Sequence, residues 1–167
     1  MKLISAIAVV AALAVAGCTK EEPKPANPNP TGGAGTSTSS VGPAPDTVAY
    51  FQQVVGDRVY FATDQHSLDG EARRTLDRQA QWLKTNAGTN VTIEGHADER
   101  GTRQYNLALG ARRANSVRSF LASQGVAANR LRAVSFGKER PVALCSDEGC
   151  WSQNRRGVSV VAGAPSS

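Results

Sequence analysis

Residues 19–45 form a long stretch that cannot build a hydrophobic core, and this limits how much of the chain can fold. The stretch, TKEEPKPANPNPTGGAGTSTSSVGPAP, holds most of the chain's prolines and almost no bulky apolar side chains. It has too little apolar surface to offset the entropy lost on folding. We interpret it as a flexible linker, which as a coil spans about 26–31 Å. The sequence therefore predicts one globular domain, residues 46–167.

An apolar run from Leu3 to Ala16 precedes the linker and is shorter than the roughly 20 residues that a membrane-spanning helix needs. It predicts a cleaved signal peptide, residues 1–17. The sequence VAGC that ends at Cys18 resembles the lipobox of bacterial lipoproteins, in which the cysteine becomes the acylated N-terminus. We expect a lipidated Cys18, with residues 18–45 as its tether. The alternative is an ordinary signal peptide followed by an incidental cysteine.

The charge of the processed chain is mildly positive. Without the signal peptide, 18 Lys and Arg residues stand against 14 Asp and Glu residues. A nucleic-acid-binding domain would show a dense basic stripe, which the sequence lacks. The chain has too few aromatic residues to form base-stacking platforms.

Two cysteines remain after Cys18, and they lie close together in the sequence ALCSDEGCW. In an oxidising compartment, Cys145 and Cys150 are expected to form a disulfide. The alternative is a metal site, but only His66 and His96 could add imidazole ligands, and the chain has no second cysteine pair. We therefore expect no metal.

Apolar periodicity predicts helices that alternate with strands in the folded domain. The expected strands are residues 58–62, 90–95, 131–136 and 156–161. The expected helices are residues 47–55, 70–86 and 102–124, and residues 137–154 are expected to form a long loop. Asp46 is the expected N-cap of the first helix, and Thr102 and Gly125 are expected to bound the last. The expected core face of that last helix is Gly110, Ala114, Val117 and Leu121.

The order of these elements is β-α-β-α-β-β after the first short helix. Helices lie between the first three strands, which makes those strands candidates for crossover pairing. The sequence therefore predicts an α/β (α+β) two-layer sandwich with the helices packed on one face of a mixed sheet.

The segment EGHADERGTRQYNLALGARRANSV, residues 94–117, places an acid and a base near the start of the longest expected helix. Asp98 lies in the turn before the helix, where free backbone N–H groups favour a carboxylate. Asn106 and Arg113 are seven residues apart and share one helix face. A carboxylate binds an ammonium and a guanidinium binds a carboxylate, so the pair suits an amino-acid centre that carries both charges. The alternative is that Asp98 caps the helix and pairs directly with Arg113.

This segment resembles the OmpA-like peptidoglycan-binding family, whose pattern is N-x-x-L-[SG]-x-x-R-A-x-x-V. The matching residues are Asn106, Leu109, Gly110, Arg113, Ala114 and Val117. The sequences GHADERGT, YNLALG, FGKERPV and W-x-x-NRR are similar to those of the peptidoglycan-associated lipoproteins within that family. The lipoprotein signal and the proline-rich tether also resemble that group. Together these motifs span nearly the whole processed chain.

The resemblance implies a peptidoglycan site. Asp98 corresponds to the residue that binds the ammonium of meso-diaminopimelate in the stem peptide, and Arg113 to the residue that binds its carboxylate. Asn106 is implied to line the same pocket, together with Ala97 and Leu109. Binding is non-covalent, and the resemblance implies no cofactor.

The resemblance also implies a protein partner, the periplasmic β-propeller protein TolB, which binds a surface that overlaps the peptidoglycan site. The candidate contacts are Glu99, Arg100, Gly101 and Thr102. Thr19 follows the lipidated cysteine where an Asp would resemble an inner-membrane retention signal, which favours the inner leaflet of the outer membrane. The implied role is to link that membrane to the cell wall and to help draw it inward at division.

The sequence departs from the family pattern at one position. The family usually continues its first strand as F-D-x-D, where this chain reads FATD, residues 61–64. Ala62 removes one carboxylate near the expected pocket. This lowers the affinity if that carboxylate shapes the pocket, and changes little if only the backbone touches the ligand.

Two other functions are alternatives. His96, Asp98 and Glu99 group a base with two acids, as a hydrolase would, but no Ser or Cys lies in a recognisable nucleophile motif. We therefore expect the protein not to be an enzyme. The second alternative is a structural lipoprotein that acts only through protein partners.

Overall fold

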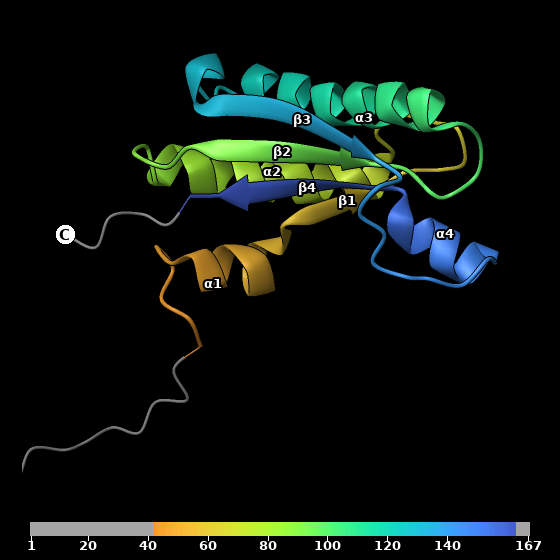
Figure 1. Ribbon diagram of the computed structural model, residues 1–167. Helices are drawn as coiled ribbons and strands as arrows, with labels where there is room; N and C mark the ends of the chain where they lie inside the picture. The colour runs from red at the N-terminus through yellow and green to blue at the C-terminus, as the bar shows by residue number, and fades with distance from the viewer. Residues whose placement is uncertain (1–41, 163–167) are drawn as a thin grey trace, which may run out of the picture. The chain divides into compact units, whose positions relative to one another are not determined.

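The structure is a computed structural model that describes residues 42–162 (Figure 1). The predicted signal peptide, the lipidation site Cys18 and most of the linker lie outside the described residues. Among the residues described, no helix combines the length and the apolarity needed to cross a membrane.

Four strands form one mixed sheet in the order β1-β4-β2-β3. They are β1 (Arg58–Tyr60), β2 (Val91–His96), β3 (Leu131–Gly137) and β4 (Arg156–Val161). β4 pairs antiparallel with both β1 and β2, whereas β2 and β3 are parallel and joined by a helical crossover. The predicted mixed sheet is confirmed, and so is crossover pairing for β2 and β3. The expected pairing of β1 with β2 is wrong because the last strand lies between them.

Two long helices, α2 (Gly70–Thr85) and α3 (Arg103–Ser123), run alongside the sheet (Figure 1). Thr102 caps α3 as predicted, with its Oγ1 accepting from the backbone N–H of Tyr105, and Gly125 follows the helix with φ +92°. All four predicted core-face residues of α3 are buried. The core between helices and sheet includes Leu76, Leu83, Val91, Ile93, Ala114, Val117 and Leu121.

The first helix differs from the prediction at its start. Thr47, not Asp46, caps α1 (Val48–Tyr50), and the chain then continues as a π-helix, Phe51–Gly56. The Phe51 ring packs 4.9 Å from that of Trp82 on α2. This contact joins the start of the domain to the helix layer.

The segment between β3 and β4 contains a helix that the sequence analysis missed. Residues 137–154 were expected to be a loop, but α4 (Glu148–Asn154) forms within them, capped by Asp147. The predicted disulfide between Cys145 and Cys150 is confirmed and closes the loop that leads into α4. A single 3-10 turn, Ala128–Arg130, precedes β3.

Helix α3 crosses β2 at a pair of glycines. A side chain at Gly95 would meet the backbone oxygen of Gly110 at 1.8 Å, so only glycine permits this approach. The close crossing sets the N-terminal half of α3 against the end of β2. It thereby places Asn106 and Arg113 beside the turn that contains Asp98.

Candidate functional site

The turn from β2 into α3 is fixed mainly through its backbone. The Ala97 N–H donates to the carbonyl of Gly137 at 2.8 Å. Lys138 Nζ donates to the carbonyls of Glu99 (3.0 Å) and Gly101 (2.7 Å). Asn106 Nδ2 donates to the carbonyl between them, that of Arg100, at 2.7 Å. Three consecutive carbonyls are therefore held, and the turn has one defined shape.

Asp98 lies in this turn and is 8% exposed. Its Oδ1 accepts from the backbone N–H and Nε of Arg100, both at 3.2 Å. Its Oδ2 accepts from Arg100 Nη2 at 2.6 Å and from Arg155 Nη1 at 3.4 Å. Burial alone would raise the pKa of Asp98, but the hydrogen bonds from Arg100 and Arg155 hold it below its ordinary value. The carboxylate is therefore ionised at neutral pH.

Arg113 is completely buried and donates to three backbone carbonyls. Its Nε donates to Gln65 at 2.8 Å, Nη1 to His96 at 2.8 Å and Nη2 to Ala62 at 3.1 Å. A guanidinium has five N–H groups, so two are left without an acceptor among the described residues. Burial lowers the pKa of Arg113 to about 10, against the opposing effect of Asp98, and the group stays charged at neutral pH.

Asp98 and Arg113 do not form an ion pair with each other among the residues described. The alternative in which Asp98 caps α3 and pairs with Arg113 is wrong, because Thr102 is the cap. Arg113 and Arg155 instead donate to consecutive carbonyls, those of Ala62 and Phe61. The acid and the base are thus held independently at one end of the sheet.

The other residues predicted at the peptidoglycan site are also buried here. Asn106 is 2% exposed and fixes the turn through the Arg100 carbonyl. Ala97 and Leu109 are each 3% exposed, so their side chains pack in the interior beneath the turn. The four candidate partner contacts, Glu99, Arg100, Gly101 and Thr102, are all exposed.

Helix α4 contributes residues that the sequence analysis did not assign to the site. Glu148 forms an ion pair with Arg155, which is the second cation on Asp98. Trp151 Nε1 donates to Glu99 Oε1 at 3.1 Å, and the Arg100 guanidinium lies 4.2 Å from the Trp151 ring centroid. The W-x-x-NRR motif was the sequence feature that could have indicated these residues. A motif alone does not reveal that they contact residues some fifty positions earlier in the chain.

A cavity of about 230 Å³ opens beside Asp98. It is lined by Thr63, Asp64, Asp98, Arg100, Gly101 and Tyr105. Tyr105 Oη donates to Asp64 Oδ1 at 3.4 Å across this wall. Two carboxylates against one guanidinium make the lining acidic, and Arg113 is not among the lining residues.

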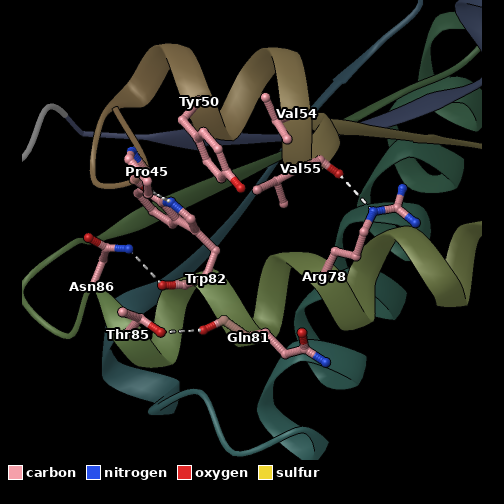
Figure 2. A pocket seen from close by; sticks show the side chains of 9 residues that line it. All are labelled: Pro45, Tyr50, Val54, Val55, Arg78, Gln81, Trp82, Thr85 and Asn86. Carbon is pink, nitrogen blue, oxygen red and sulfur yellow. Dashed lines mark hydrogen bonds between the residues drawn. The ribbon is translucent and has the colours of Figure 1, made fainter. Parts of the chain in front are cut away.

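A second, larger hollow of about 340 Å³ lies between the first helix and α2 (Figure 2). Its lining residues are Pro45, Tyr50, Val54, Val55, Arg78, Gln81, Trp82, Thr85 and Asn86. Trp82 Nε1 donates to the carbonyl of Pro45 at 2.6 Å, and Arg78 Nε donates to the carbonyl of Val55 at 3.2 Å. The lining of this groove contains one cation, Arg78, and no carboxylate, unlike the cavity beside Asp98.

His96 is 1% exposed and packs against Phe136, with ring centroids 5.6 Å apart. Burial, aided by the charges of Arg156 and Arg140, lowers the pKa of His96 to about 4. Its Nδ1 has no hydrogen-bond partner in the described part of the chain. A neutral imidazole shut away from solvent cannot serve as a base for an external substrate, which argues against the hydrolase alternative.

Ala62 meets the site through its backbone. Its carbonyl accepts from Arg113, and its methyl group is on the exposed side of the chain. Any residue type at this position supplies the same acceptor. The departure from the usual family pattern therefore leaves the support of Arg113 in place.

The chain is similar to known proteins in both sequence and fold. The sequence profile described as the OmpA family matches residues 60–155. The chain is 53% identical to a peptidoglycan-associated lipoprotein of Agrobacterium fabrum over 158 residues, which cover 95% of this chain and 87% of that protein. It is also 53% identical to a peptidoglycan-associated lipoprotein of Rhizobium meliloti, with 96% and 88% covered.

Solved structures agree with the fold. The crystal structure of the peptidoglycan-associated lipoprotein from Burkholderia pseudomallei superposes with a TM-score of 0.62 at 45% identity, covering 64% of this chain and 90% of that one. The C-terminal domain of Helicobacter pylori MotB superposes with a TM-score of 0.61 at 20% identity, covering 65% and 86%, which supports the fold alone.

The chain belongs to the OmpA family, as the sequence motifs predicted. Within it, the relatives at 53% identity are peptidoglycan-associated lipoproteins by name. The expectation of a non-enzymatic protein is confirmed by this family membership.

Proposed function

We propose that this protein binds peptidoglycan without covalent chemistry, through the meso-diaminopimelate of the stem peptide. The ammonium of that centre binds Asp98 and its carboxylate binds Arg113. The observation that supports this most is that both groups are buried at one end of the sheet, charged, and not paired with each other. The names of the relatives support the same ligand class.

The protein is further proposed to be an outer-membrane lipoprotein anchored through Cys18. Its tether, residues 18–45, lets the domain reach the wall, and the Tol-Pal system uses it during constriction at division. The exposed turn of Glu99 to Thr102 is the proposed contact for TolB, which would compete with the wall because Asp98 lies in the same turn. Globomycin should block processing of the precursor, and normal processing in its presence would refute the anchor.

The binding test compares two kinds of sacculi. Those with meso-diaminopimelate offer both charges at the side-chain end of the residue, whereas those with lysine offer only the ammonium. We expect strong retention of the wild-type protein on the first and weak retention on the second. Asp98→Ala and Arg113→Ala should each abolish retention on the diaminopimelate-type sacculi, since loss of one partner leaves the other charge unpaired at a cost of about 2–5 kcal/mol.

Arg103→Ala is the matched control for charge, because Arg103 is exposed and pairs with Glu139 away from Asp98. It should bind like the wild type. Equal retention of the wild type on both kinds of sacculi would refute two-point recognition. No retention on either would favour the alternative of a structural lipoprotein that acts only through protein partners.

A further inference from the structure

Asp98 has no free acceptor position in this structure. A carboxylate offers about four lone-pair positions, and Asp98 accepts four hydrogen bonds, three from Arg100 and one from Arg155. An incoming ammonium must therefore displace one of these donors. The side chain of Arg100 already occupies the position that a ligand's cation would take.

Arg100 is the donor that can leave. Its side chain is 39% exposed, whereas that of Arg155 is 6% exposed and is also fixed by Glu148 and by the carbonyl of Phe61. Arg100 borders the 230 Å³ cavity together with Asp98, so its guanidinium can move out as a ligand enters. Its backbone stays in place, because Asn106 holds the Arg100 carbonyl.

We infer that Arg100 is a built-in competitor for the ammonium subsite on Asp98, and that it limits the affinity of the site. This rests on the proposed function. A lone ammonium would replace a two-pronged guanidinium contact with a single point charge and gain nothing in exchange. A centre that also carries a carboxylate meets the same cost at Asp98, so its advantage over a lone ammonium must come from Arg113 and not from Arg100.

Trp151 holds this competitor in place. The Arg100 guanidinium stacks on its ring, and the ring is itself oriented by the hydrogen bond from Nε1 to Glu99. Helix α4, which carries Trp151, is only two turns long and begins inside the loop closed by the Cys145–Cys150 disulfide. Removing the ring should therefore act in the same direction as removing Arg100, with a smaller effect.

The test measures binding of the full-length protein, in detergent, to diaminopimelate-type and to lysine-type sacculi. Arg100→Gln removes the competing charge, Trp151→Leu removes its support, and Arg103→Gln is the matched control. We expect Arg100→Gln to bind diaminopimelate-type sacculi about two- to fivefold more tightly. Its affinity for lysine-type sacculi should rise by a similar factor, so that the preference for diaminopimelate stays as in the wild type, because both ligands displace the same side chain. Arg103→Gln should stay within about twofold of the wild type.

Arg100→Gln binding that is weaker than the wild type or unchanged overturns the inference, provided that the variant unfolds at the wild-type temperature. If Arg100→Gln unfolds early, Trp151→Leu decides in its place, and an unchanged or weaker affinity overturns the inference. Failure of the proposed function looks different. In that case the wild type itself shows no preference between the two sacculi, and Arg113→Lys binds as the wild type does.

Discussion

Arg113 and Arg130 lie at opposite ends of the parallel strand pair, and each guanidinium donates to several backbone carbonyls. Arg113 donates to three, near the end of β2. Arg130, which precedes β3, donates to the carbonyls of Leu83, Asn86 and Thr89, where α2 ends. In both places a long cation satisfies acceptors that would otherwise be buried or unpaired.

The difference between them lies in burial and in the nearby acid. Arg113 is fully buried, and Asp98 lies close enough for its charge to oppose the lowering of the Arg113 pKa by burial. Arg130 is half-buried, and within residues 42–162 its hydrogen-bond partners are all backbone carbonyls. At the Arg130 end the cation satisfies the carbonyls at the C-terminus of α2 and in the turn that follows. At the Arg113 end the guanidinium is fixed near an acid with which it does not pair. We therefore expect a ligand site at the Arg113 end and not at the Arg130 end.

The largest expected effect comes from removing each arginine in turn. Arg113→Met should lower the free energy of unfolding by about 3–5 kcal/mol, because it leaves three carbonyls without a donor, and it should abolish retention on diaminopimelate-type sacculi. Arg130→Met should cost about 1–2 kcal/mol, because its carbonyls are nearer to water, and should leave retention unchanged. Urea unfolding and the sacculus assay measure both quantities. Loss of wall binding in Arg130→Met would contradict the proposal that only Arg113 contributes to the ligand site.

A smaller effect should appear on acidification at the Arg113 end. The pKa of His96 is about 4 in the folded protein, below its usual 6.5, so the folded state disfavours the protonated imidazole. The stability that neutral His96 provides is complete above pH 6.5 and is lost as the pH falls toward 4, by about 3 kcal/mol in all. The measurement is urea unfolding at several pH values for the wild type and for His96→Gln. The variant shows the pH dependence that comes from the carboxylates, which is subtracted from that of the wild type. Identical pH profiles for the two proteins would contradict the buried, neutral histidine.

The smallest effect should come from removing the N-caps of α3 and α1. Thr102→Ala removes the cap of α3 and should cost about 1 kcal/mol, with weaker wall binding because the turn of Asp98 leads into that helix. Thr47→Ala removes the cap of α1 and should cost about as much or less, with no change in wall binding. Thermal unfolding and the sacculus assay separate the two. Equal loss of binding would mean that the caps act only through global stability.

The helices and strands were largely predictable because each is encoded locally. The sequence alone indicates the cap and the apolar face of α3. It also indicates the alternation of apolar and polar residues in β2. The position of β4 between β1 and β2 was not predictable, since alternation reveals which residues face the core but not which strand is the partner. Helix α4 was missed because a two-turn helix depends on tertiary contacts and on its disulfide more than on its own periodicity.

The candidate site was predictable in its residues but not in its arrangement. Spacing alone indicated that Asp98 and Arg113 could flank one site. The acceptors of Arg113 at Ala62 and Gln65 are 51 and 48 residues away, and Arg155 reaches Asp98 across 57 residues. Such contacts depend on how the helices pack on the sheet. The sequence therefore could not show that the Arg100 side chain binds the carboxylate of Asp98.

The most direct test of two-point recognition is a titration of the ¹⁵N-labelled protein with meso-diaminopimelate, followed by NMR. The account predicts that the Nε–H signal of Arg113 and the backbone amide of Asp98 shift together and saturate at the same ligand concentration, while the Nε–H signal of Arg130 does not move. Shifts confined to Arg130 or to Trp82 in the apolar groove, or none at saturating ligand, would contradict it.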